Sequence, residues 1–87
     1  MRVSVWDTYV PREDGKVMHF DILVPDKMID TDIIFEYGKK YLNTKLFGTG
    51  VLTSSECRFC HIQSAPPQVV NSISEKGYHI IEMENCS

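Results

Sequence analysis

Residues 3–24 read VSVWDTYVPREDGKVMHFDILV, and this stretch decides the fold. Two runs rich in β-branched and aromatic residues, 3–10 and 17–24, flank a polar segment that contains Asp14-Gly15. An Asp-Gly pair is a strong hairpin signal, because a type I′ turn needs positive φ at both of its central residues. The stretch therefore predicts an antiparallel β-hairpin that turns at Asp14-Gly15.

A two-residue loop at Asp14-Gly15 places Tyr9 opposite Phe20 and divides the hairpin into two faces, because side chains alternate along a strand. The face expected to join the core carries Val5, Asp7, Tyr9, Met18, Phe20, Ile22 and Val24. The reverse face carries Trp6, Thr8, Val10, Val17, His19, Asp21 and Leu23. A longer loop that pairs Val10 with Val17 keeps the same division. Asp7 then lies on the core face, where its carboxylate must be hydrogen-bonded or reach an edge.

The rest of the chain alternates helical and extended patterns. Asp30 suits a helix N-cap, and apolar or aromatic pairs recur at helical spacing up to Leu42, with Gly38 expected to pack closely against the sheet. Residues 44–56 are expected to form a connecting loop, and residues 56–63 alternate as a strand does. A second helix is expected to begin near Pro66-Pro67 and to stop at Gly77, and the last strand to span 78–85.

These elements predict one α+β domain over residues 1–87 in the order ββαβαβ. We expect a four-stranded mixed sheet with an N-terminal antiparallel hairpin and two helices, because each helix follows a strand and leads into another, as crossovers between parallel neighbours do. The expected core consists of Met18, Phe20, Ile22, Val24, Ile34, Leu42, Val70, Ile73, and Ile80 or Ile81.

Composition argues against several classes of partner. The net charge is −3 and the nine Lys and Arg residues are scattered, whereas nucleic acids and anionic membranes need a dense cationic face. The N-terminal run reaches Asp7 too early for a signal peptide, and no apolar run approaches a membrane span. We therefore expect a cytoplasmic protein, and three cysteines suggest no disulfide framework.

The segment Cys57-Arg58-Phe59-Cys60-His61 admits several interpretations. Cys57, Cys60 and His61 are candidate zinc ligands if the backbone turns between the two thiols, with Cys86 and His79 as further candidates. The thiols are also a candidate redox pair. Covalent haem is the least favoured, because its attachment normally follows export. We favour a strand, in which positions three apart point to opposite faces and the thiols do not meet. No cofactor is then expected.

A second candidate site lies on the predicted reverse face of the hairpin. It is a polar surface cluster made of Trp6, Thr8, His19 and Asp21. A His–Asp pair can handle protons, but no nucleophile can be assigned beside it, so the sequence carries no catalytic signature. The favoured interpretation is that Asp21 accepts hydrogen bonds that satisfy a partly covered face.

Four segments carry a resemblance to a known family. They are residues 5–10 (VWDTYV), 14–23 (DGKVMHFDIL), 56–61 (ECRFCH) and 77–83 (GYHIIEM). Together they resemble a family of small bacterial proteins known as domain of unknown function number twenty twenty-four. The resemblance implies a compact domain of two helices and four strands, and it implies no activity and no site residues.

Two functions follow as expectations. The first is a small non-catalytic binding or interaction module, with a homodimer formed through the half-apolar reverse face of the hairpin. The alternative is a thiol- or metal-dependent protein centred on Cys57, Cys60 and His61. The sequence identifies no ligand.

Overall fold

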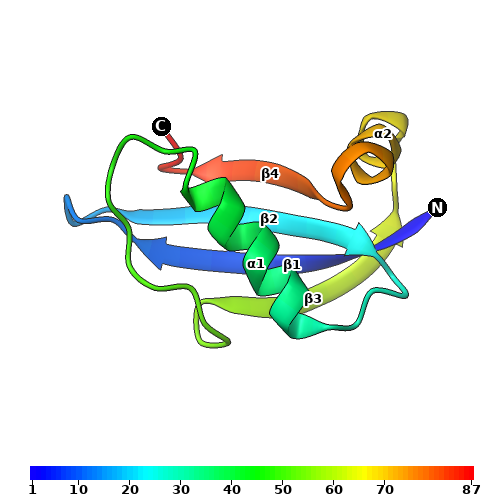
Figure 1. The fold of residues 1–87 in the computed structure, drawn as a ribbon, viewed down its shortest axis with the longest axis horizontal. Helices are drawn as coiled ribbons and strands as arrows, with labels where there is room; N and C mark the ends of the chain where they lie inside the picture. Colours follow the sequence, from blue (N-terminus) through cyan, green and yellow to red (C-terminus); the bar gives the residue numbers. More distant parts are fainter.

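The computed structural model describes residues 1–87 as four strands and two helices in the predicted order ββαβαβ (Figure 1). The elements are β1 (Arg2–Pro11), β2 (Val17–Pro25), α1 (Thr31–Leu42), β3 (Cys57–Ser64), α2 (Pro67–Lys76) and β4 (His79–Glu84). The predicted α+β class is confirmed. Neither helix is long and apolar enough to cross a membrane.

The sheet has the strand order β3-β1-β2-β4, and every pair of neighbours is antiparallel. The predicted mixed sheet is therefore wrong. The segment that contains α1 carries the chain from β2 past β1 to the far edge, so β2 and β3 run in the same direction with β1 between them. The segment that contains α2 then carries the chain to the opposite edge, where β4 pairs with β2.

The hairpin between β1 and β2 turns through three residues instead of two. The Arg12 N–H donates to the Lys16 carbonyl at 2.8 Å, and the Gly15 N–H donates to the Arg12 carbonyl at 3.1 Å. Gly15 has φ +90°, so it supplies the left-handed residue that ends a three-residue loop. Thr8 consequently lies opposite Phe20. The predicted register is wrong by one residue.

This shift moves every β1 side chain to the other face, because the side-chain period of a strand is two. Trp6, Thr8 and Val10 now share a face with Phe20, and Asp7 leaves the core. Asp7 lies instead directly opposite Asp21 on the reverse face.

Helix α1 covers the face that carries Phe20. The Asp30 carboxylate caps it by accepting from the N–H groups of Asp32 and Ile33, as predicted. A Cβ on Gly38 would lie 2.6 Å from Cδ1 of Leu52, so this glycine permits close packing. The buried cluster on this face contains Val10, Met18, Phe20, Ile22, Val24, Ile34, Leu42, Leu52, Cys57, Tyr78 and Cys86.

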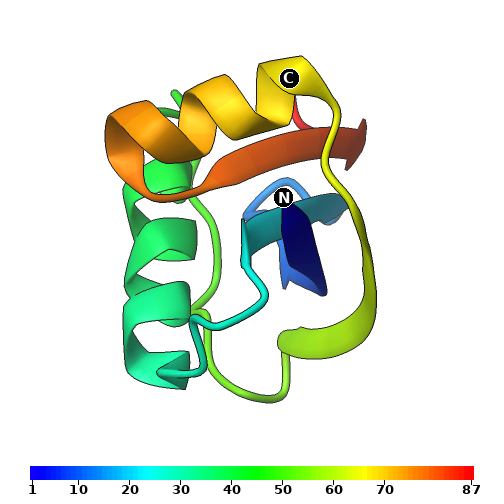
Figure 2. The same cartoon turned by 90° about the vertical axis from the view of Figure 1, so that its right-hand side faces the viewer.

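Helix α2 packs on the opposite face and forms a second, smaller core. Its Val69 and Ile73 group with Val3, Val5 and Leu23, and Figure 2 shows its axis crossing that of α1. Gly77 ends the helix with φ +93°, as predicted. The predicted core is largely confirmed.

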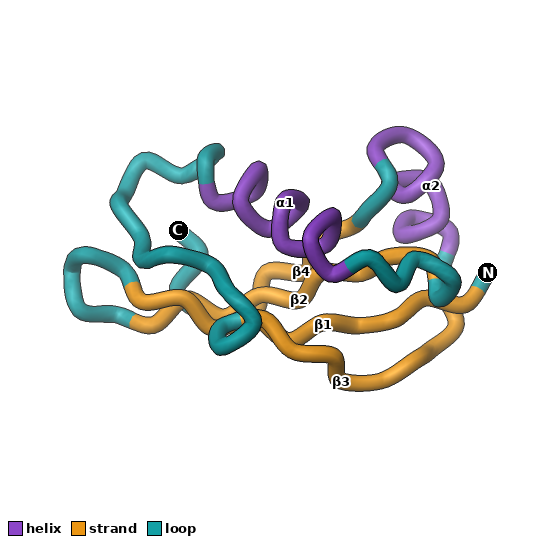
Figure 3. The backbone as a smooth tube through the Cα atoms, turned by 60° about the horizontal axis from the view of Figure 1, so that its bottom comes forward, coloured by secondary structure: helices purple, strands orange, loops and turns teal.

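The exceptions to the predicted core lie in α2 and β4. Val69 replaces Val70 as the fully buried valine, and Ile80 and Ile81 are only half-buried. Helix α2 and the N-terminus lie at one end of the sheet, and the β1–β2 turn lies at the other (Figure 3). The reverse face near Asp7 therefore has no helix over it.

Candidate functional site

The reverse face carries a cluster of three polar side chains, Asp7, His19 and Asp21. Asp7 and Asp21 are cross-strand partners, and His19 precedes Asp21 by two positions on β2, so all three share one face. Their potential ligand atoms lie within 4.8 Å of one another. Nε2 of His19 lies 3.8 Å from Oδ1 of Asp7 and 3.7 Å from Oδ1 of Asp21. Both distances exceed a hydrogen bond, for which N···O is ~2.7–3.2 Å.

Two atoms of this cluster are buried and have no hydrogen-bond partner. They are Nε2 of His19 and Oδ1 of Asp21. An unsatisfied buried polar group costs about 1–3 kcal/mol, and native proteins contain few of them. The cluster therefore retains unused capacity to bind a ligand atom.

The two carboxyl groups of the cluster behave differently. Burial, reinforced by the hydrogen bond to Asp7 and by the charge of Asp7, raises the pKa of Asp21 to about 6. The hydrogen bond from Asp21 holds the pKa of Asp7 below its usual value. One of the pair is thus readily protonated while the other stays ionised.

An irregularity in β3 brings further groups to the cluster. Val5 pairs with His61 and Trp6 pairs with Phe59, so Cys60 is an extra residue in a β-bulge. The bulge places His61 on the same side as Cys60, and Nδ1 of His61 lies 3.1 Å from Sγ of Cys60. Simple alternation along the sequence predicts His61 on the side of Cys57, and this prediction is wrong because an inserted residue interrupts the alternation.

The two thiols of the CxxC segment face opposite sides of the sheet. Cys57 is buried on the α1 side, where its Sγ accepts from the Thr8 hydroxyl at 3.4 Å, and burial raises the pKa of its thiol. Cys60 is exposed, and desolvation together with the hydrogen bond to Asp7 raises the pKa of its thiol. The structure therefore brings Cys60 and His61 together and leaves Cys57 apart.

The observed register of β1 places the four residues of the predicted polar cluster on two different faces of the sheet. Thr8 is fully buried on the α1 side, and Trp6 donates to the Ser4 hydroxyl at 3.2 Å on that side. Only His19 and Asp21 of the four remain together. The predicted two-residue loop does not place Asp7 beside them, whereas the observed three-residue loop, which Gly15 fits equally well, does.

Tyr9 is the other group that the sequence reading missed. Its ring stacks on the His19 ring, with centroids 4.1 Å apart and an interplanar angle of 11°. This contact holds the imidazole against the sheet. Tyr9 also lines the adjoining pocket.

The predicted dimer face is divided in the same way. Val17 is exposed, but Leu23 lies in the core under α2, and Trp6 and Val10 lie on the α1 side. A homodimer stays a prediction, which light scattering at micromolar concentration tests. It would need a different set of contacts.

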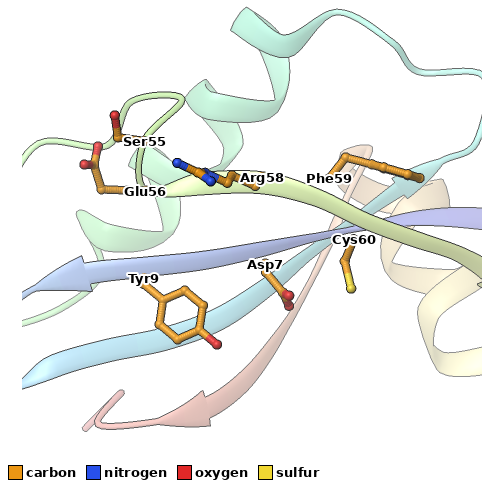
Figure 4. A pocket seen from close by; sticks show the side chains of 7 residues that line it. All are labelled: Asp7, Tyr9, Ser55, Glu56, Arg58, Phe59 and Cys60. Carbon is orange, nitrogen blue, oxygen red and sulfur yellow. The ribbon is translucent and has the colours of Figure 1, made fainter.

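An open pocket of about 570 Å³ adjoins the cluster at the β3 edge (Figure 4). It is lined by Asp7, Tyr9, Ser55, Glu56, Arg58, Phe59 and Cys60. Arg58 lies directly opposite Asp7 in the β1–β3 ladder, yet the two form no ion pair. Glu56 is turned to the preceding loop, where it accepts from the N–H and hydroxyl of Thr53.

Comparisons with known proteins place the chain in a family without assigning it an activity. The chain is 42% identical to protein NE1680 from Nitrosomonas europaea, whose NMR structure superposes with a TM-score of 0.82 over 100% of both chains. No curated protein matches it. Residues 1–83 match the family described as Domain of unknown function, DUF2024. The resemblance drawn from the sequence is thus confirmed, and the chain belongs to the DUF2024 family.

Proposed function

We propose that the protein is a small non-catalytic binding module whose ligand occupies the pocket between Asp7 and Arg58. The observation that carries this proposal is a pair of opposite charges, directly across from each other on β1 and β3, that do not neutralise one another. Asp7 has only the distant His19 as an ion-pair partner, and Arg58 has none. Two such groups facing one pocket remain available to a ligand.

The lining of the pocket supports a small zwitterionic ligand, such as an amino acid. A ligand carboxylate suits the Arg58 guanidinium, which presents paired donors, and a ligand ammonium suits the Asp7 carboxylate. Tyr9, with 51% of its surface exposed, offers apolar contact on the side of Asp7. Phe59 closes the pocket from the other side of the β3 edge, where its ring packs against Trp6 (Figure 4). The volume of about 570 Å³ lies in the usual range for small-molecule sites, ~300–1,000 Å³.

The chemistry of the pocket supports binding over catalysis. Its only thiol, on Cys60, has a raised pKa and is therefore protonated at neutral pH, whereas a reactive cysteine needs a lowered pKa. The alternative, a thiol- or metal-dependent protein centred on Cys57, Cys60 and His61, would need the two cysteines to converge. They lie on opposite faces of β3.

The wider setting of the proposal comes from the sequence and the relative. A bacterial origin is supported by the similarity to the Nitrosomonas protein. The net charge of −3 and the scattered Lys and Arg residues support the absence of nucleic-acid and membrane partners, and we propose a cytoplasmic location with it. These remain parts of the proposal.

Native mass spectrometry of untagged protein tests the proposal first, because it detects a co-purified small molecule directly. A panel of the common amino acids, followed by amide shifts in two-dimensional NMR, then identifies the ligand class. Shifts in β1 and β3 are expected, and Arg58→Gln should weaken binding by about tenfold, equivalent to ~1.4 kcal/mol.

Lys40→Gln is the matched control, since it removes the same charge from an exposed position on α1. It should leave the affinity unchanged. Equal weakening by the two variants would reject the pocket as the binding site. Absence of a co-purified molecule together with no response to the panel would reject the proposed ligand class.

A further inference from the structure

The Asp7–His19–Asp21 cluster has the spacing of a metal site. A tetrahedral ion with bonds of ~2.0–2.2 Å holds its ligand atoms ~3.3–3.6 Å apart. Nε2 of His19 lies 3.7 Å and 3.8 Å from the two carboxylate oxygens. Shifts of a few tenths of an ångström, within the reach of side-chain rotation, would bring all three atoms onto one ion.

The same distances disfavour the simplest metal-free explanation. A protonated His19 shared between two carboxylates would draw Nε2 to within ~2.7–3.2 Å of an oxygen. Instead, Nε2 of His19 and Oδ1 of Asp21 are buried without any hydrogen bond. A cation between them would satisfy both atoms.

We propose that Asp7, His19 and Asp21 bind one divalent transition-metal ion of the zinc class. One imidazole nitrogen with two carboxylate oxygens suits such an ion, since magnesium and calcium are bound by oxygen alone. Two ionised carboxylates also match a doubly charged ion. The site differs from the sequence-predicted set of Cys57, Cys60 and His61.

The surroundings favour a well-defined geometry. All three ligands stand on the adjacent strands β1 and β2, which position side chains more firmly than loops do. Stacking on Tyr9 restrains the His19 ring. A bound ion would also relieve the repulsion between Asp7 and Asp21, because both could then be ionised at once.

Three protein ligands leave one position of a tetrahedral ion open. Cys60 is a candidate for this position, since it lines the adjoining pocket with Asp7 and the β-bulge directs its thiol to this side (Figure 4). The fourth ligand is thus either the Cys60 thiolate or a solvent molecule in the open pocket. These two forms differ in their optical spectra.

Cobalt titration of untagged, chelator-treated protein tests the site, with isothermal calorimetry for zinc in parallel. We expect one ion per chain and the intense visible bands of tetrahedral cobalt. Asp21→Asn keeps the shape of the side chain and should lower the affinity at least tenfold. Asp26→Asn, at an exposed position just beyond β2, is the matched control and should bind as the parent does. Urea unfolding of both variants verifies that they are folded.

The outcomes separate the explanations. No cobalt spectrum and no zinc heat would overturn the proposal, as would full affinity in folded Asp21→Asn. Loss of binding in Cys57→Ser but not in Asp21→Asn would reassign the metal to the cysteine segment and also overturn it. A thiolate-to-cobalt band that disappears in Cys60→Ser assigns the fourth ligand to sulfur, and binding without that band assigns it to solvent. Asp7 belongs to both proposals, but the titration contains no small molecule, so a failure to bind metal leaves the amino-acid panel as a separate test of the pocket.

Discussion

The two faces of the β1–β2 hairpin differ in whether their buried polar groups have hydrogen-bond partners. On the α1 face, the Thr8 hydroxyl is fully buried opposite Phe20, and it contacts the Trp6 carbonyl and the Cys57 sulfur at 3.4 Å each. On the reverse face, one position along, Asp7 and Asp21 lie opposite each other, and Asp21 keeps a buried oxygen without a partner. The first arrangement stabilises the fold. The second lowers the free energy of unfolding but leaves polar atoms available to bind a ligand.

The largest expected difference between the faces is in aromatic packing. Phe20→Ala should lower the free energy of unfolding by about 3–5 kcal/mol, because Phe20 is fully buried in the main core. Tyr9→Ala, on the neighbouring strand, should cost only ~1 kcal/mol, since half of Tyr9 is already exposed and mainly its stacking on His19 is lost. Urea denaturation of both variants measures this, and equal costs would contradict the division of the sheet into two faces.

The cysteines provide an intermediate test. Cys57→Ser should cost ~1–3 kcal/mol, because it places a second hydroxyl in the buried α1 face beside Thr8. Cys60→Ser should change stability by less than ~0.5 kcal/mol, since Cys60 is exposed. In native protein a thiol reagent should modify Cys60 first and Cys57 only on unfolding. Simultaneous modification of both would contradict the strand geometry.

The smallest expected effect is an increase in the free energy of unfolding when a carboxylate on the reverse face is removed. Asp21→Asn should raise the free energy of unfolding by about 1–2 kcal/mol at pH 7, because it removes a carboxylate that burial disfavours. The folded pKa of about 6 lies above the ordinary value of 3.8. Below pH ~3 the group is almost fully protonated in both states and contributes nothing.

Between those pH values the unfolded chain releases its proton first, so ionisation of Asp21 lowers stability as the pH rises. The advantage of Asp21→Asn over the parent should therefore be near zero at pH ~3, grow from pH ~4 to ~6 and then level off. Urea unfolding from pH ~3 to ~8 measures it. An advantage that shrinks as the pH rises would show that Asp21 is stabilised as the anion instead, as a bound cation would make it.

Helix caps, helix ends and strands, which are set by residues close together in the sequence, were predictable from the sequence. The N-cap at Asp30, the end of α2 at Gly77 and the strand over β3 are encoded by hydrogen bonding and side-chain periodicity within a few residues. The opposite orientation of Cys57 and Cys60 was predictable for the same reason. Family membership followed from the segments that carry it.

The candidate site was only half predictable. His19 and Asp21 share a face because they are two residues apart on one strand, a local property. Their partnership with Asp7 depends on the pairing of two strands, and with Cys60 on a bulge in a third. Neither the strand pairing nor the bulge can be predicted from the alternation of side chains along one strand.

Local sequence patterns were sufficient to identify the strands and helices, to give their order and to place their ends close to the observed residues. The tertiary structure alone decided the register of β1, the all-antiparallel sheet and the covering of each face by a different helix. Two- and three-residue loops both accept Gly15, so the turn does not discriminate between the registers. Packing does, since the observed register buries Thr8 and Val10 under α1 and frees Asp7 to reach solvent, a choice made by contacts between residues far apart in the chain.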